Sequence, residues 1–256
     1  MSLVIKYGGN AMTDPATRAA VAAGVRELAR EVPPVLVHGG GPHIAAALDA
    51  RGIEHRFVRG LRVTTDEAME VVEAVLTVLG KELASEIGMA AGLTGRDANL
   101  LTARRLGDEL GRVGTVATVN ATVLAVLRAA GLIPVVASVA LEAGGEGASA
   151  TSLNVNADEV AGAIAGVLGE GALFLTNVPG VLEDANDPRS LLSELPGSEA
   201  RARIADGRIS GGMIPKVESA LFALGQGAPF AVIADGRHPD GVARALSGSG
   251  TRLLPD

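Results

Sequence analysis

The segment PVLVHGGGP, residues 34–42, decides the fold class of this chain. A short apolar run ends at His38, three glycines follow at once, and a helix is expected from there to about Arg51. A strand, a glycine turn and a helix in succession are typical of a mainly parallel α/β sheet, in which ligands bind beyond the carboxyl ends of the strands. Consecutive glycines let an anion approach the backbone, and the amino end of a helix favours negative charge.

A second glycine loop follows the first expected strand. Residues 3–7 are apolar apart from Lys6, and they lead into Gly8 and Gly9. Two such loops within the first 41 residues predict an anion-binding edge of the sheet. The chain has no G-x-x-x-x-G-K-[ST] segment, and Ile44 occupies the place of the last glycine in G-x-G-x-x-G. These departures exclude a P-loop protein and disfavour a nicotinamide dehydrogenase.

The alternation of apolar and helical segments continues along the chain. Extended segments are expected at 99–103, 113–119, 133–137, 172–176, 230–234 and 251–254, and as a hairpin at 55–63. Helices are expected at about 15–31, 65–87, 120–130, 156–168, 199–206 and 213–226. Strands that alternate with helices indicate a mainly parallel sheet covered on both faces.

Composition narrows the possible functions. The chain has 256 residues, 48% of them hydrophobic, which is ample for a core. Its net charge of −7 and its five aromatic residues argue against nucleic-acid binding. The absence of cysteine excludes disulfides, thiolate metal sites and thiol nucleophiles. No signal peptide or membrane-spanning run is evident, so a cytoplasmic location is expected.

Lysine is rare here, since 19 of the 22 basic residues are arginine. Lys6 and Lys216 stand close to glycine pairs, whereas Lys81 does not. A compact ammonium beside exposed backbone N–H groups can hold phosphate. The alternative, a coding bias toward arginine with three remnant lysines, is favoured for Lys81 only.

Other polar residues have two interpretations each. Asp158, in the segment NVNAD at 154–158, either caps a helix or holds an ammonium group in place. Arg62 lies in an extended segment and either binds a carboxylate with its planar fork or is an edge-strand arginine in water. His38 and His43 flank the glycine loop at a spacing that suits no common metal site, which favours a structural role.

Taken together, a set of motifs resembles the amino acid kinase family over residues 3–254. The motifs are IKYGG (5–9), VHGGGP (37–42), GLRVT (60–64), GLTGRDANL (92–100), LGRVGTVATVN (110–120), NVNAD (154–158), TNVPGVL (176–182) and GGMIPK (211–216). The resemblance implies a three-layer αβα sandwich with a mainly parallel central sheet. It further implies an N-terminal lobe, residues 1–170, that binds an acyl amino acid and carries the dimer interface, and a C-terminal lobe, residues 171–256, that binds ATP.

The resemblance also implies roles for single residues. The catalytic residues would be Lys6 and Lys216, which contact phosphate, Asp158, which organises the lysines, and Gly9, which with Gly8 donates N–H groups to the γ-phosphate. The acyl amino acid would be held by Gly40, Gly41, Arg62 and Asn154. The nucleotide would be bound by Gly8, Asn177, Val178, Gly180, Val181, Leu182, Ile209 and Ser210. No protein metal site is expected, because Mg²⁺ would arrive with ATP.

The implied activity is ATP-dependent phosphorylation of the γ-carboxylate of N-acetyl-L-glutamate in arginine biosynthesis. A carboxylate is ionised at neutral pH, so no general base is required. The chain departs from the common family pattern at Gly80 and Asn177, and its 177–180 loop also resembles kinases for carrier-linked α-aminoadipate in lysine biosynthesis. A non-catalytic sensor on the same fold is the alternative from another class. Because no extra helix precedes the first strand, an arginine-insensitive homodimer joined through residues 65–87 is expected.

Overall fold

A computed structural model describes residues 2–8, 12–144, 151–184, 186–237 and 240–256 of the chain. It divides into two compact units. Unit 1 comprises Met1–Pro34 and Ala161–Asp256, and unit 2 comprises Val35–Val160. The units differ from the predicted lobes because the first strand and helix associate with the C-terminal part of the chain. The assignment of ligands to the predicted lobes stays a prediction.

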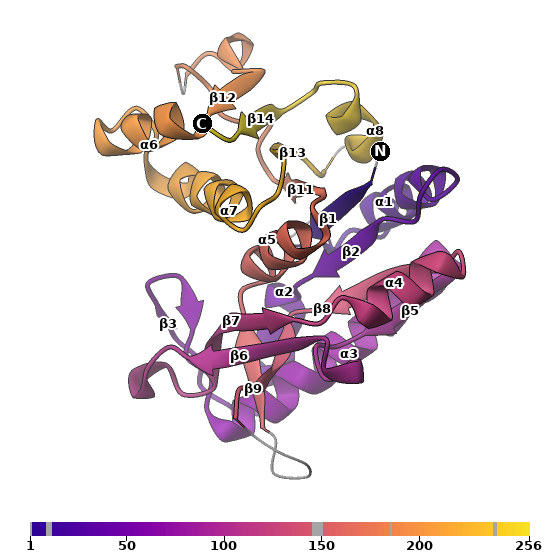
Figure 1. Ribbon diagram of the computed structural model, residues 1–256. Helices are drawn as coiled ribbons and strands as arrows, with labels where there is room; N and C mark the ends of the chain where they lie inside the picture. Colours follow the sequence, from indigo (N-terminus) through magenta and orange to yellow (C-terminus); the bar gives the residue numbers. More distant parts are fainter. Residues whose placement is uncertain (1, 9–11, 145–150, 185, 238–239) are drawn as a thin grey trace. The chain divides into compact units, whose positions relative to one another are not determined.

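Unit 1 is built on five sheet strands (Figure 1). Their spatial order is β12 (Glu194–Pro196), β14 (Thr251–Leu254), β13 (Ala231–Asp235), β11 (Gly171–Thr176) and β1 (Leu3–Tyr7). The pairs β1–β11, β11–β13 and β12–β14 are parallel, and only β13–β14 is antiparallel. Their residues are mostly buried on both faces, which explains the continuous apolar runs in the sequence.

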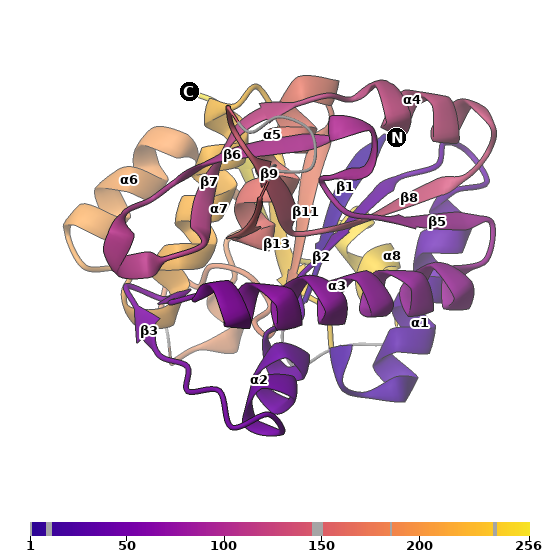
Figure 2. The same ribbon diagram turned by 90° about the horizontal axis from the view of Figure 1, so that it is seen from below.

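Helices cover both faces of these strands. One side carries α1 (Pro15–Leu28) and α8 (Gly241–Leu246), and the other carries α7 (Ile214–Gly225) with the unit 1 part of α5 (Ala157–Leu168) (Figures 1 and 2). The remaining helix of the described part of this unit is α6 (Gly197–Ala205). Asp14 caps α1 by accepting the Thr17 N–H at 2.8 Å, as the Thr13-Asp14-Pro15 signal predicts.

Unit 2 has a three-stranded parallel sheet and a small barrel. The sheet order is β2 (Val35–His38), β8 (Ile133–Ala137) and β5 (Ala90–Leu93). Figure 2 shows α3 (Asp66–Ile87) and α4 (Thr122–Ala129) on opposite sides of β5 and β8. The closed barrel consists of β10 (Ser152–Val155), β7 (Val113–Val119), β6 (Leu101–Arg105) and β9 (Val139–Glu142).

The core of unit 2 supports the glycine loop. Helix α2 (Gly41–Asp49) packs against α3 through Leu48 and Leu76, which are 0% and 1% exposed. Burial of a leucine side chain stabilises the fold by about 2 kcal/mol. The hairpin of β3 (Phe57–Val58) and β4 (Leu61–Arg62) turns at Arg59 and Gly60, which both have positive φ, as a two-residue hairpin turn requires.

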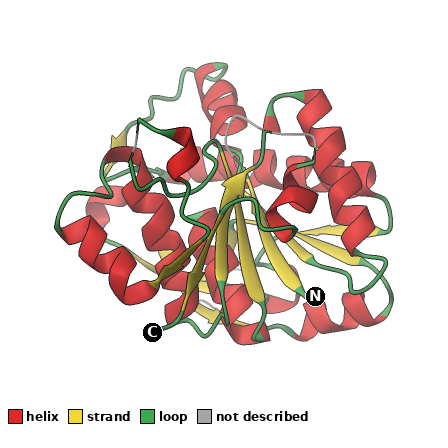
Figure 3. Ribbon diagram, turned by 90° about the horizontal axis from the view of Figure 1, so that it is seen from above, coloured by secondary structure: helices red, strands yellow, loops and turns green. Residues whose placement is uncertain are grey.

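The fold class expected from the sequence is confirmed. The strands are mainly parallel and helices flank them on both sides (Figure 3). The expected hairpin and the long helix over 65–87 are present, whereas β5, β9, β10 and β12 were not expected from the sequence. Within the described residues no helix combines the length and the apolar character that crossing a membrane requires.

Candidate active site

Gly40 and Gly41, in the loop after β2, have different surroundings. A Cβ at Gly40 would lie 2.8 Å from Leu76 Cδ2, so Gly40 permits close packing on α3. A Cβ at Gly41 would meet no atom within 4 Å, because Gly41 faces open space. No side chain caps the amino end of α2, so its N–H groups remain available to an anion.

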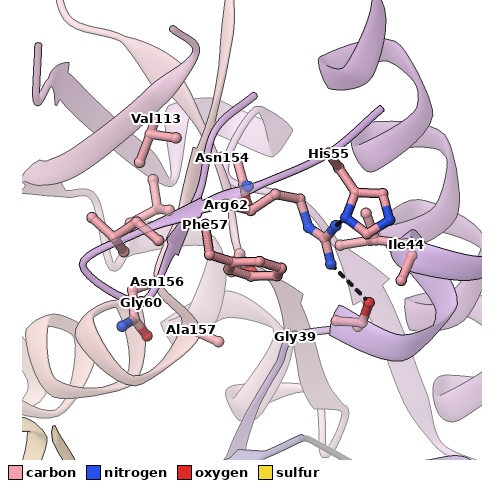
Figure 4. A pocket seen from close by; sticks show the side chains of 16 residues that line it. Gly39, Ile44, His55, Phe57, Gly60, Arg62, Val113, Asn154, Asn156 and Ala157 are labelled. Atoms are coloured by element: carbon pink, nitrogen blue, oxygen red, sulfur yellow. Dashed lines mark hydrogen bonds between the residues drawn. The ribbon is translucent and has the colours of Figure 1, made fainter. Parts of the chain in front are cut away.

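That open space is a cavity of about 450 Å³ within unit 2 (Figure 4). It brings together all four residues predicted to hold the acyl amino acid: Gly40, Gly41, Arg62 and Asn154. Other residues that line it include His55, Phe57, Val113, Asn156 and Ala157. The cavity therefore joins a helix amino end, a guanidinium and two amide side chains, which suits a small molecule with carboxylate and amide groups.

Arg62 is held on several sides. Its side chain is largely buried, at 8% exposure for the residue, and its Nη1 lies 2.7 Å from His55 Nδ1. Its Nη2 donates to the Gly41 carbonyl at 3.2 Å, and its Cζ lies 4.7 Å from the centre of the Phe57 ring. Burial lowers the pKa of Arg62, while the Asp49 carboxylate acts in the opposite direction. These two bonds use two of the five N–H groups of the guanidinium and leave three for a ligand.

Asn154 is tied to the same strand as Arg62. Its Nδ2 donates to Thr64 Oγ1 at 3.1 Å, and the buried Thr64 hydroxyl donates to the Arg62 carbonyl at 2.8 Å. Asn154 also lies on β10, where it pairs with Val113 and Val139 of the barrel. Thr64 thus links the amide of Asn154 to the backbone of Arg62.

His38 orients the glycine loop. Its Nδ1 lies 3.0 Å from the Gly39 carbonyl, so that nitrogen carries the proton and donates. Burial lowers the pKa of His38 to about 4, so the ring is neutral at pH 7. In the described part of the chain Nε2 has no partner, and Gly80 packs so closely that a Cβ there would be 2.8 Å away. The structural role expected for His38 agrees with this geometry.

Both predicted phosphate-contacting lysines belong to unit 1. Lys6 lies on β1 opposite Phe174 of β11 and is half-buried. Lys216 lies in the first turn of α7, where its Nζ donates to the Gly212 carbonyl at 2.9 Å. A 3₁₀ turn, Gly211–Met213, leads directly into α7, and the Ile214 N–H donates to the Gly211 carbonyl. A cation at such a helix end suits a phosphate group.

The other two predicted catalytic residues are Gly9 and Asp158. Gly9 lies outside the described residues, whereas its neighbour Gly8 is described and buried. Asp158 belongs to unit 2 and lies in the first turn of α5, where its N–H donates to Asn156 Oδ1 at 2.8 Å. The expected role of Asp158 in organising the lysines stays a prediction.

Apart from Gly8, the predicted nucleotide residues form two segments of unit 1. In the first, the Val181 N–H donates to Thr251 Oγ1 at 2.8 Å, and a Cβ at Gly180 would lie 2.6 Å from that oxygen. In the second, the Ile209 N–H donates to the Arg203 carbonyl at 2.8 Å, and Ser210 is exposed. The side chains of Val181 and Ile209 are buried, so they position the backbone. Asn177 is exposed, and Val178 and Leu182 are half-buried.

Arg203 connects these two segments. Its Nη1 lies 2.5 Å from Glu183 Oε2, one residue after the first segment, and its Nη2 lies 2.7 Å from Glu199 Oε1. Hydrogen bonds to Glu199 and Glu183 raise the pKa of Arg203. Sequence reasoning misses Arg203, because its acidic partners do not form a motif.

Residues of the unit 2 cavity that sequence reasoning also misses include His55, Phe57 and Asn156. Phe57 could be found from the sequence, because a turn at Arg59 and Gly60 pairs residue 57 with Arg62. His55 could not, because its contacts depend on how α2 packs beside the hairpin.

Comparisons with known proteins indicate the family of this chain. The model of the amino acid kinase family matches residues 1–235. The chain is 52% identical over 254 residues to the acetylglutamate kinase of Deinococcus radiodurans, covering 99% of this chain and 100% of that protein. It is 44% identical over 264 residues to the acetylglutamate kinase of a Nostoc species, covering 99% and 87%.

Solved structures have the same fold. The smu.665 protein of Streptococcus mutans has a TM-score of 0.79 at 28% identity and covers 100% of this chain and 99% of its own. An N-acetylglutamate synthase of Neisseria gonorrhoeae has a TM-score of 0.83 at 21% identity, covers 100% of this chain and 59% of its own, and shows the fold alone. From the family match and these identities, the chain belongs to the amino acid kinase family.

Proposed function

We propose that this protein transfers the γ-phosphoryl group of ATP to the γ-carboxylate of N-acetyl-L-glutamate, forming N-acetylglutamyl 5-phosphate in arginine biosynthesis. The observation that carries the proposal is the 52% identity, over 99% of the chain, to an acetylglutamate kinase. The cavity of unit 2 supports it, because its polar groups correspond to those of the acceptor.

The acceptor has one carboxylate to be held, one to react, and an acetamide. Arg62 binds the α-carboxylate with the N–H groups that His55 and Gly41 leave unused. Asn154, fixed by Thr64, binds the amide portion. The N–H groups of Gly40 and Gly41, at the uncapped end of α2, hold negative charge on the acceptor.

The chemistry is a direct displacement at phosphorus. A γ-carboxylate oxygen attacks the γ-phosphorus, and the bond from phosphorus to the bridging oxygen breaks, which releases ADP. The attacking carboxylate is already ionised, so the protein supplies alignment and positive charge and no proton acceptor. We assign charge neutralisation to Lys6 and Lys216, N–H donation to Gly8 and Gly9, and lysine positioning to Asp158.

The nucleotide side rests on unit 1. The ammonium of Lys216, in the first turn of α7, fits a phosphate chain. We assign the nucleoside to the segment 177–182 and to Ile209 and Ser210. Mg²⁺ bound to the ATP phosphates would supply further charge neutralisation. Within the described residues no three acidic or histidine side chains gather as a metal site.

We also propose a homodimer joined through α3. The exposed Val78 on this helix and the exposed Met89 just after it, at 58% and 69% exposure, offer apolar surface to a second copy. Light scattering tests the assembly, and a hexamer would contradict it. Insensitivity to arginine stays a prediction, to be checked by titrating arginine into the assay, and so does a cytoplasmic location.

Hydroxylamine converts acyl phosphates to hydroxamates, which give a coloured complex with Fe³⁺, and this reaction provides the test. Wild-type protein with ATP, Mg²⁺ and acetylglutamate should form hydroxamate, and carrier-linked α-aminoadipate in the same assay should not replace acetylglutamate. If carrier-linked α-aminoadipate is turned over and acetylglutamate is not, the protein would instead act in lysine biosynthesis. Absence of turnover with either, alongside intact acetylglutamate binding, would indicate a sensor.

A further inference from the structure

His55 lies between an acidic side chain and the guanidinium of Arg62. Its Nδ1 is 2.7 Å from Arg62 Nη1 (Figure 4), and its Nε2 is 3.2 Å from Asp49 Oδ1. The three residues come from three places: the end of α2, the connection before β3, and β4. They form a continuous row of hydrogen bonds that ends in the cavity.

The partners determine where the imidazole carries its proton. Arg62 can only donate, so His55 Nδ1 must accept with its lone pair. The single proton of the neutral ring is then on Nε2, where it points to the Asp49 carboxylate. Asp49 therefore selects the tautomer that can hold Arg62, in the way that a carboxylate orients a histidine in many sites.

We propose that His55, set in this tautomer by Asp49, is a positioning residue that holds Arg62 in the orientation required to bind the acceptor's α-carboxylate. This inference rests on the proposed function, because Arg62 is assigned there to that carboxylate. His55 does not touch the reacting atoms, and it acts only through Arg62.

The surroundings of Arg62 explain why such support matters. The strand that carries it has two residues, and Phe57, which stacks on it, is 58% exposed. Apolar packing from the hairpin therefore constrains the guanidinium weakly, and its orientation depends on polar contacts. Behind His55 lies a second cavity, of about 570 Å³, lined by Asp49 and Glu54. An apolar residue at 55, which offers no acceptor to the guanidinium, would leave Arg62 free to turn toward that side.

The main experiment is a set of steady-state measurements with the hydroxamate assay. His55→Leu removes the acceptor and should raise the KM for acetylglutamate about tenfold, which corresponds to about 1.4 kcal/mol. The kcat and the KM for ATP should stay within about twofold, because those steps do not use Arg62. His55→Asn keeps an oxygen near the Nδ1 position and should rescue most of the loss. Glu54→Gln, on the same connection and facing the same second cavity, is the matched control.

Adding His55→Leu to the Arg62→Met variant distinguishes an effect of His55 through Arg62 from a purely structural role of His55. In Arg62→Met, addition of His55→Leu should change the affinity for acetylglutamate by less than about twofold, measured by calorimetry. An unchanged KM in His55→Leu would overturn the inference, as would an equal loss in the Arg62→Met background or failure of His55→Asn to rescue. If the wild type forms no hydroxamate from acetylglutamate, it is the proposed function that fails. If it does and His55→Leu is normal, only the inference fails.

Discussion

The two units differ in how firmly they hold the side chains to which we assign ligand roles. In unit 2, Arg62 is 8% exposed and has His55, Gly41 and Phe57 as neighbours from different elements. In unit 1, Lys216 bonds to the Gly212 carbonyl of its own turn, and Ser210 beside it is exposed. On the proposed assignment, acceptor recognition is prearranged, whereas phosphate contact uses a side chain that exchanges a local bond for the ligand.

The largest effect should follow from removing the phosphate-side charge. Lys216→Ala should lower kcat about 100-fold or more, because a charge that stabilises the transferring phosphoryl group is lost. The KM for acetylglutamate should stay within about twofold, since Lys216 belongs to the other unit. Lys81→Ala is the control, because Lys81 donates to the Gly92 carbonyl in unit 2. A normal kcat in Lys216→Ala would contradict the role assigned to Lys216 in neutralising phosphate charge.

Removing the guanidinium of Arg62 should affect the binding of acetylglutamate instead of kcat. Arg62→Met should raise the KM for acetylglutamate by about 30-fold or more, because a charged, bidentate donor to a carboxylate is removed. Arg62→Lys should recover only part of this, because an ammonium lacks the planar fork. A larger loss in kcat than in KM would place Arg62 on the reacting group.

The free energy of unfolding should depend on pH through His38, which lies beside the glycine loop of unit 2. The pKa of His38 is about 4 in the folded protein, below the usual 6.5, so the unfolded chain binds more protons as the pH falls. Its contribution to stability is present above pH 6.5 and is lost toward pH 4. Between pH 7 and pH 5 the wild type should lose about 2 kcal/mol of unfolding free energy from this group.

His38→Asn keeps a donor beside the Gly39 carbonyl but does not titrate. Denaturant unfolding at both pH values should therefore give a flatter dependence for this variant, whatever its absolute stability. Glu142, whose pKa is held at about 2 chiefly by hydrogen bonds from Arg105 and Thr151, does not titrate in this window. An equal pH slope in both proteins would show that His38 is protonated normally.

The smallest effect concerns the nucleotide segments. Arg203→Leu removes the link between Glu183 and α6 and should raise the KM for ATP about fivefold, because both segments must then be ordered on binding. The KM for acetylglutamate should not change. Arg208→Leu, which removes an exposed pair with Asp206 nearby, is the matched control. Equal effects of the two variants would remove the special role of Arg203.

Sequence reasoning succeeds where the signal is local. The glycine loop of α2, the Arg59–Gly60 turn and the Asp14 cap each need only neighbouring residues, and each is present in the structure. The four residues expected to hold the acceptor do line one cavity. Their ligand roles, and those of the lysines, stay predictions.

The features that the sequence does not reveal depend on contacts between residues that are far apart in the chain. The barrel closes through β9 and β10, which pair with strands far along the chain. His55 gains its role from Asp49 and Arg62, and Arg203 from acidic residues on separate segments. Gly80, a departure from the family pattern, is explained by the His38 ring that packs against it. None of these pairs has a recognisable spacing.

A calorimetric titration of acetylglutamate into Lys216→Ala and Arg62→Met tests the division of roles most directly. We predict wild-type affinity in Lys216→Ala, although its turnover is lost, and binding weakened about 30-fold or more in Arg62→Met. Wild-type binding by Arg62→Met, or loss of binding in Lys216→Ala, would contradict the account.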